Sequence, residues 1–261
     1  MDSLRVLRRD PELAVFPLVA GLAGLVYLAV LFGGVSALGG VDSGPALYAF
    51  LFVLYFGSAF IAAFFTAGLV HETRLAFADR EPSFRSGLGA AWAHVGTLLA
   101  WAAVSATVGL VVRLLESRGR DNVVAGLVAG LFSVAWSILT YFVVPVIVFE
   151  DVGITDALSR SGATFTETWG ETVGAGFGVG LVTLLFLVGG AALAVLLVVL
   201  GAASGSVLGL LGALAVGAVA LLAAYLVGVT LSAVARTALY VYATEGRTPR
   251  EFENVDFSRL G

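Results

Sequence analysis

Six stretches of the chain carry no charged side chain and are each long enough to cross a lipid bilayer as a helix. They cover residues 15–34, 46–70, 92–112, 123–149, 173–200 and 207–235. The hydrocarbon core of a bilayer requires about 20 helical residues, and a backbone within it has to satisfy its hydrogen bonds internally. The sequence therefore predicts an all-α fold, a polytopic membrane helical bundle with six transmembrane helices, in a single integral membrane domain over residues 1–261.

The composition agrees with this class of protein and excludes several others. Hydrophobic residues make up 59% of the chain and charged residues 12%, whereas soluble domains carry about 25% charged residues. The chain has no Cys, which excludes disulfides and thiolate metal sites. All 14 basic residues are Arg, a bias typical of a GC-rich genome or of salt adaptation, and both explanations stay open. No basic stripe that could neutralise phosphates occurs, so nucleic acid is not expected as a partner.

The Arg residues also predict the orientation, because positive charge is retained on the cytoplasmic side of a membrane. With the N-terminus inside, 11 of the 14 Arg residues lie on that side, and Arg113, Arg118 and Arg120 lie outside. We expect a multi-pass protein of the cell membrane with both termini, residues 1–14 and 236–261, in the cytoplasm. The three Arg residues of loop 113–122 are the exception to the rule.

Segment 150–171, EDVGITDALSRSGATFTETWGE, joins two of the apolar stretches and has helical periodicity. Its apolar side chains fall on one helical face, which carries Ile154, Leu158, Phe165 and Trp169. A second segment after Pro82 repeats the pattern with Phe84, Leu88 and Trp92, and Leu4 and Leu7 form a shorter version near the N-terminus. Amphipathic helices of this kind lie in the membrane interface with the apolar face toward lipid. The order predicts three units, each an amphipathic segment followed by a helix pair.

Two polar stripes run along the third and fourth apolar stretches. The residues that share a helical face are His94, Thr97, Trp101 and Ser105 in the third stretch and Ser133, Ser137 and Thr140 in the fourth. Such side chains either line a path for a solute or hydrogen-bond to their own backbone and to a neighbouring helix. The second interpretation is favoured, and the first stays open.

No residue pattern indicates catalysis or cofactor chemistry. The stretch HETRL from His71 begins like a zinc-protease helix, but Leu75 stands where the second His would close the metal site. No acidic or basic side chain lies in the middle of a predicted span, where proton-driven and ion-driven transporters keep one. We therefore expect no catalytic, cofactor-binding or metal-binding residue, no cofactor and no enzyme activity.

Small residues and one proline shape the predicted spans. Gly174 and Gly178 are four residues apart, and the same spacing recurs later in the chain at Gly205, Gly209, Ala213 and Gly217. This spacing lets helix backbones approach closely, and packing within the chain is favoured over packing between copies. Pro145 predicts a kink near the cytoplasmic end of the fourth span.

Three stretches of the chain resemble a known group of proteins: SLRVLRRDPELAVFP near the start, AWSILTYFVVPVIVFEDVGITDALSRSGATFTETWGE in the centre and TALYVYATEGRTP near the end. They are similar to a domain-of-unknown-function family of six-span prokaryotic membrane proteins, largely from salt-loving archaea. The central stretch resembles, more distantly, the membrane domain of glycerophosphodiester phosphodiesterase-like proteins, which is not their catalytic part. The resemblance implies fold and topology and assigns no activity.

Two functions are consistent with these patterns. The first is a non-catalytic membrane protein that organises lipids or partner proteins at the cytoplasmic membrane through its amphipathic segments. The alternative is a transporter or channel for a neutral or lipid-like solute, which would use the polar stripes as its path. Membrane lipids are the expected partners in both cases, and protein partners or a homo-oligomer are left open.

Overall fold

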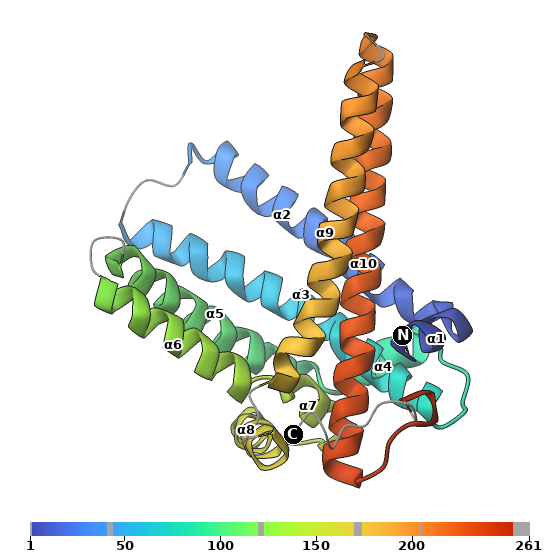
Figure 1. The fold of residues 1–261 in the computed structure, drawn as a ribbon. Coiled ribbons are helices and arrows are strands. Elements are labelled where there is room, and N and C mark those ends of the chain that lie inside the picture. The colour runs from blue at the N-terminus through green and yellow to red at the C-terminus, as the bar shows by residue number, and fades with distance from the viewer. Residues whose placement is uncertain (1, 41–43, 120–122, 170–173, 204, 253–261) are drawn as a thin grey trace.

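The computed structural model describes residues 2–40, 44–119, 123–169, 174–203 and 205–252, and every regular element in these ranges is a helix (Figure 1). The elements are α1 Asp2–Arg9, the 3₁₀ helix η1 Pro11–Ala14, α2 Val15–Ala37, α3 Pro45–Phe77, α4 Phe84–Ala93, α5 Val95–Gly119, α6 Val123–Leu139, α7 Val143–Glu150, α8 Ile154–Trp169, α9 Gly174–Ala203, α10 Val207–Glu245 and the 3₁₀ helix η2 Arg250–Phe252. By length and composition, 6 of the described segments could cross a membrane. The all-α class and the six predicted spans are confirmed.

The order of the elements follows the three predicted units. The short helices α1 and η1 precede the pair α2 and α3, α4 precedes α5 and α6, and α8 precedes α9 and α10. Helix α7 is separate from α6, whereas the sequence predicts a single fourth span that is kinked at Pro145.

The fourth span is divided between α6 and α7 by a turn at residues 140–142. Pro145 accounts for the division, because its ring excludes the carbonyl group four residues earlier, at Tyr141, from a regular helix. The N–H of Phe142, in this turn, donates a hydrogen bond of 2.9 Å to the Ser161 hydroxyl on α8. The predicted kink is therefore a complete break, located one turn before the proline.

Several spans run further than their apolar stretches. The largest extensions are those of α3 to Phe77, of α5 to Gly119 and of α10 beyond Ala235 to Glu245. Helix α10 ends where Gly246 adopts a left-handed φ of 64°, a conformation that favours glycine. Arg236, expected at the end of a span, therefore lies within α10, and the first part of the predicted C-terminal tail is helical. A helix ends at a breaker such as Gly246 rather than at the last apolar residue.

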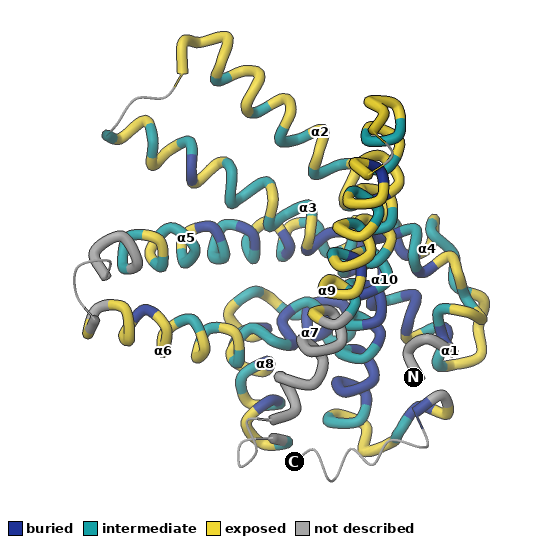
Figure 2. The backbone as a smooth tube through the Cα atoms, turned by 45° about the horizontal axis from the view of Figure 1, so that its top comes forward, coloured by how far each residue is buried: buried dark blue, intermediate teal, exposed yellow. Residues whose placement is uncertain are grey.

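The helices meet at one end of the molecule, and beyond it α9 and α10 run away from the other spans (Figure 1). We call this end the base, and it consists of α1, η1, α4, α7 and α8 together with the adjoining ends of the spans. Buried residues gather in the base, whereas the far parts of the spans are largely exposed (Figure 2). One hydrophobic cluster fills it, and its members include Leu13, Phe16, Leu98, Ile147 and Val234.

Helices α9 and α10 form a long hairpin that stands apart from α2, α3, α5 and α6 (Figures 1 and 2). Small residues bring the two helices together, since a Cβ on Gly190 would lie 2.6 Å from the Ala224 Cβ and one on Gly217 would lie 3.3 Å from the Ala194 backbone. The small-residue spacing thus serves packing within the chain at these positions. Positions 174–180 lie outside the residues whose surroundings the structure describes.

The hydrogen bond between Phe142 and Ser161 can be tested by replacing Ser161 with Ala. The substitution leaves the buried Phe142 N–H without an acceptor, which is expected to lower the free energy of unfolding by about 1–3 kcal/mol. Denaturant unfolding of the detergent-solubilised protein measures this change. The exposed Ser159 on the same helix provides the control, and equal stabilities of S161A and S159A would contradict the assignment.

Candidate functional site

An aromatic cluster at the break between α6 and α7 joins three parts of the base. The Phe142 side chain is fully buried, and its ring centre lies 5.5 Å from that of Tyr240 on α10 and 6.3 Å from that of Phe165 on α8. The neighbouring Tyr141 ring lies 5.5 Å from Phe165 and also meets the Arg236 guanidinium at 4.7 Å. The break in the fourth span therefore organises the contacts of α8 and α10.

A polar network centred on Glu150 surrounds this cluster. The Tyr240 hydroxyl and the Arg160 guanidinium each donate a hydrogen bond to the Glu150 carboxylate. The bond between Arg160 and Glu150 raises the pKa of the Arg160 guanidinium above its ordinary value. On α3, the Arg74 guanidinium lies 3.0 Å from the Glu245 carboxylate and 4.5 Å from the Phe149 ring centre. The network links α3, α7, α8 and α10 at the edge of the base.

Glu72 on α3 is the charged residue buried most completely among the described residues, with 0% of its surface exposed. One of its carboxylate oxygens accepts a hydrogen bond of 2.6 Å from the N–H of Ser83, the residue that caps the start of α4. A carboxylate at this position also interacts favourably with the positive end of the helix dipole. Glu72 therefore attaches the N-terminus of α4 to α3.

Glycines make room for this attachment. A Cβ on Gly87 of α4 would lie 2.9 Å from the Glu72 side chain, and a Cβ on Gly68 of α3 would lie 2.6 Å from the Phe16 ring. Both glycines are buried. The close contact of α2, α3 and α4 thus depends on the absence of a side chain at two positions.

The apolar face predicted for α4 lies partly on the protein and partly outside it. Phe84 is half-buried, with its ring centre 5.0 Å from that of Phe16, and Leu88 packs against the core cluster. Trp92 is 61% exposed, although its ring meets that of Phe64 at 5.4 Å. The exposed Trp92 side chain is the part of this face that is free to meet lipid.

The apolar face predicted for α8 contacts the base. Phe165 is buried, and Ile154 and Leu158 are half-buried against the core cluster. The Trp169 side chain lies outside the described residues. Most of this face therefore packs on protein, while the position of α8 in the membrane interface stays a prediction.

His94 lies at the junction between α4 and α5 rather than within a span. The third span begins at Val95, because a turn at His94 ends α4. Its Nδ1 lies 2.8 Å from the Ala90 carbonyl oxygen, and its Nε2 lies 3.4 Å from the Asp151 carboxylate in the link between α7 and α8. His94 thus joins the turn between α4 and α5 to the link between α7 and α8.

The remaining residues of the two polar stripes lie along α5 and α6. Trp101 and Trp136 stack between these helices, with ring centres 6.0 Å apart. On α6 the Ser133 and Ser137 hydroxyls donate to the carbonyls of Ala129 and Ser133, and Thr140, in the turn that follows, donates to the carbonyl of Trp136 on α6. On α5, Thr97 is half-buried and the Ser105 hydroxyl is buried without a partner. These three hydroxyls therefore hydrogen-bond to backbone carbonyls of α6.

A cavity of about 220 Å³ lies where α2, α3 and α10 separate from one another. Its lining is mostly aliphatic or aromatic and includes few hydroxyls. The sequence patterns did not predict this cavity, because it depends on the relative placement of three helices far apart in the chain. Among the described residues, no group of 3 or more His, Asp or Glu side chains could hold a metal ion.

Comparison with known proteins adds one family. Residues 45–250 match the model of a family of unknown function, DUF6159. The chain matches no curated protein and no solved structure. The expected resemblance to a family of unknown function is confirmed, whereas the archaeal association and the distant likeness to glycerophosphodiester phosphodiesterase-like proteins stay predictions.

The role of Glu72 can be tested by limited proteolysis. Replacing Glu72 with Ala removes the acceptor for the Ser83 N–H and is expected to weaken the attachment of α4 by about 2 kcal/mol. Trypsin should then cleave the detergent-solubilised protein faster after Arg80, in the link between α3 and α4. E72Q keeps an acceptor oxygen and should remain close to the wild type. Cleavage of E72A at the wild-type rate would contradict the role assigned to Glu72.

Proposed function

We propose, since the chain belongs to the DUF6159 family of unknown function, that it is a non-catalytic protein of the cell membrane that organises lipids around its spans. The observation that carries this proposal is the distribution of the core. The base holds the helices together, and beyond it α9 and α10 run away from the other spans (Figures 1 and 2). Lipid is proposed to fill the space between these two helices and the other spans.

The exposed surfaces of the spans support this role. Large apolar side chains on the hairpin are open to the surroundings, with Val195 at 63% and Leu208 at 84% exposure, and on α2 Leu25 is exposed to 65%. In a bilayer these surfaces contact hydrocarbon chains. A molecule whose α9 and α10 separate from the other spans presents more such surface than a closed bundle of the same helices.

Transport along the polar stripes has weaker support. The α6 hydroxyls are satisfied by their own helix, and the Trp101 and Trp136 rings fill space between α5 and α6. A solute path would need polar side chains that face a shared cavity. The organisation of lipids is therefore the function that the geometry supports best.

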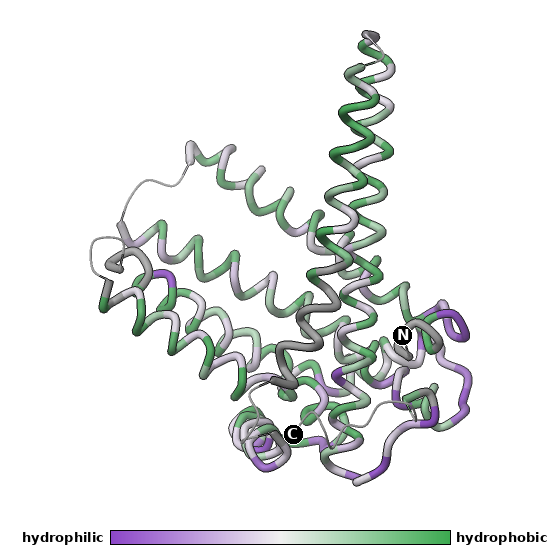
Figure 3. The backbone as a smooth tube through the Cα atoms, viewed as in Figure 1, coloured by the Kyte–Doolittle hydropathy of each residue, from purple (hydrophilic) through white to green (hydrophobic). Residues whose placement is uncertain are grey.

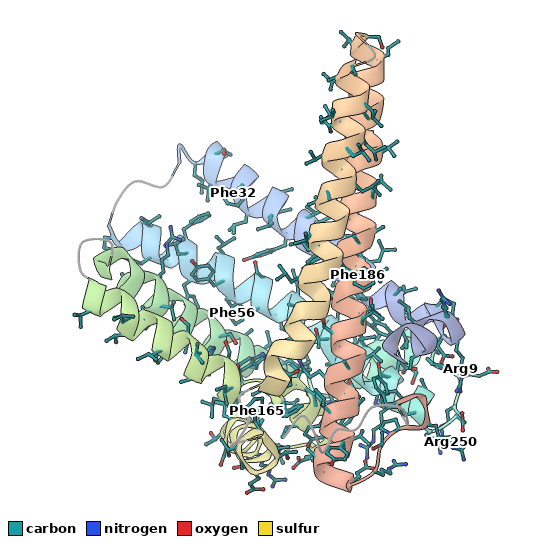
Figure 4. The ribbon with its side chains drawn as sticks, viewed as in Figure 1. Arg9, Phe32, Phe56, Phe165, Phe186 and Arg250 are labelled. Carbon is teal, nitrogen blue, oxygen red and sulfur yellow. The ribbon has the colours of Figure 1, made fainter. Side chains whose placement is uncertain are left out.

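The base is proposed to face the cytoplasm, with both termini on that side. Hydrophilic residues gather there (Figure 3), and they include the exposed Arg8, Arg80 and Arg85. Arg9 and Arg250 lie close together on the same part of the base, where each pairs with Asp79, at 3.1 and 3.3 Å (Figure 4). Positive charge near the ends of spans is retained in the cytoplasm, which supports this orientation.

Partner proteins or further copies of the chain are proposed to meet the outer face of α8. This face is polar and exposed, with Asp156 and Glu167 among its residues. The opposite face of the helix is attached to the base through Ser161 and Phe165. The contacts of Ser161 and Phe165 therefore hold α8 on the base, while its polar face stays exposed.

Reconstitution into vesicles of phosphatidylcholine and phosphatidylglycerol tests the proposed function. A lipid that carries a spin label near the end of one chain reports how many lipids are motionally restricted, and glycerol efflux from the same vesicles reports transport. We expect the restricted fraction to rise with the protein content while efflux stays at the level of empty vesicles, and S133A should change neither. Efflux far above empty vesicles that S133A reduces would support the transporter instead.

A further inference from the structure

The cavity between α2, α3 and α10 is partly open to the surroundings, and the residues that line it all belong to segments that could cross a membrane. Helix α2 contributes Pro17, Ala20, Gly21, Gly24 and Leu28, helix α3 contributes Ser58, Ile61, Ala62, Phe65, Thr66 and Leu69, and helix α10 contributes Tyr225, Val229 and Ala233. The surroundings at this depth are hydrocarbon rather than water. Whatever fills the cavity comes from the membrane or from another chain.

The length of the cavity matches one leaflet of a bilayer. It extends along α2 from Pro17 to Leu28 and along α3 from Ser58 to Leu69, which corresponds to about 16 Å at the helical rise of about 1.5 Å per residue. The hydrocarbon core of a bilayer is about 30 Å thick, so one leaflet contributes about 15 Å. Pro17 and Leu69 lie toward the base, and the cavity therefore belongs to the leaflet on that side.

The width of the cavity excludes a helix. A helix with its side chains is about 10 Å across and would need on the order of 1,000 Å³ over this length, several times the 220 Å³ present. The volume divided by the length gives a width of about 4 Å, close to the contact distance of about 3.5–4.0 Å between carbon atoms that a methylene chain requires. The space fits one extended hydrocarbon chain.

Water is also a poor occupant of this cavity. A buried water makes about three hydrogen bonds to polar groups around it. The hydroxyls in the lining are those of Ser58, Thr66 and Tyr225, and Ser58 and Thr66 are separated by about 12 Å along α3. The other 11 of the 14 lining residues offer a water no polar side chain.

Two glycines on α2 create the open space. The positions that a Cβ would take on Gly21 and on Gly24 have no atom within 4 Å. Small residues in membrane helices usually permit close approach of a second backbone, as Gly190 does in the hairpin, but no backbone approaches these two. Their effect is to leave the wall of the cavity without side chains.

We propose that this cavity binds one hydrocarbon chain of a lipid from the leaflet beside the base, which gives the lipid-organising function proposed above, on which this inference rests, a defined binding site. The bound chain lies against Gly21 and Gly24, between the hairpin and the remaining spans. It occupies the point at which α10 begins to diverge from α2 and α3, and it extends the packing of the base into the membrane.

Photochemical labelling in vesicles tests the site. The wild-type protein is reconstituted with phosphatidylcholine that carries a diazirine near the end of one chain, and labelled residues are mapped by mass spectrometry. G24L places a side chain in the cavity without meeting another atom at its Cβ, and it favours the helix because Leu is a better helix former than Gly. G33L is the matched control, since Gly33 is also open on α2 but lies outside the lining.

We expect labelling of the cavity residues on α3 and α10 to fall about tenfold in G24L, equivalent to about 1.4 kcal/mol, and to stay at the wild-type level in G33L. Labelling of the exposed α9 face at Val188, Val195 and Val199 provides the internal reference and should not change. Tryptic cleavage after Arg80 at the wild-type rate in both variants shows that the base is intact.

Two results would overturn the site. One is equal labelling of the cavity residues in G24L, G33L and the wild type. The other is a dimer, observed by native mass spectrometry, that the G24L substitution dissociates, because this result would assign the space to a second copy of the chain. If the cavity is not labelled but the motionally restricted lipid fraction still rises with protein, only this inference fails. If that fraction does not rise either, the proposed function fails with it.

Discussion

The hydrogen bond from the Phe142 N–H to the Ser161 hydroxyl is the interaction on which the base depends. Pro145 interrupts the fourth span and leaves backbone groups that a membrane interior cannot satisfy. Ser161 supplies the acceptor from α8, and the Phe142 ring then lies between α8 and α10. The break in the fourth span therefore places Phe142 in the hydrophobic core of the base.

The rest of the molecule follows from where this core lies. The short helices α4 and α8 use their apolar faces largely for contacts within the base, and buried or networked carboxylates such as Glu72 and Glu150 attach them to the spans. Beyond the base, α2 and α3 stay in contact through Phe32 and Phe50, with ring centres 5.5 Å apart, whereas α9 and α10 run away from these spans (Figure 1). The open crevice beside Gly21 and Gly24 lies between α10 and these two helices, and we propose that it gives lipid a place there.

Apolar length and periodicity were sufficient to predict the six spans, the three units and the apolar residues of α4 and α8. They could not show whether protein or lipid covers an apolar face, because Phe165 and Trp92 give the same periodic signal and only one is buried. The contact between Glu72 and Ser83 and the bond between Glu150 and Tyr240 join distant segments, so no local spacing reveals them. The sequence correctly predicts that Pro145 interrupts the fourth span. The hydrogen bond from the Phe142 N–H to the Ser161 hydroxyl joins distant segments and could be found only in the fold.

The central claim is that α9 and α10 are held to the other spans at the base and separate from them beyond it. Because the chain has no Cys, spin labels can be placed at single introduced cysteines at Ala46, near the far end of α3, and Ala203, near the far end of α9. Pulsed electron paramagnetic resonance in lipid nanodiscs then measures their separation. The account predicts a distance several times the roughly 8–10 Å between packed helices, and a distance close to that packing value would show a closed bundle and contradict it.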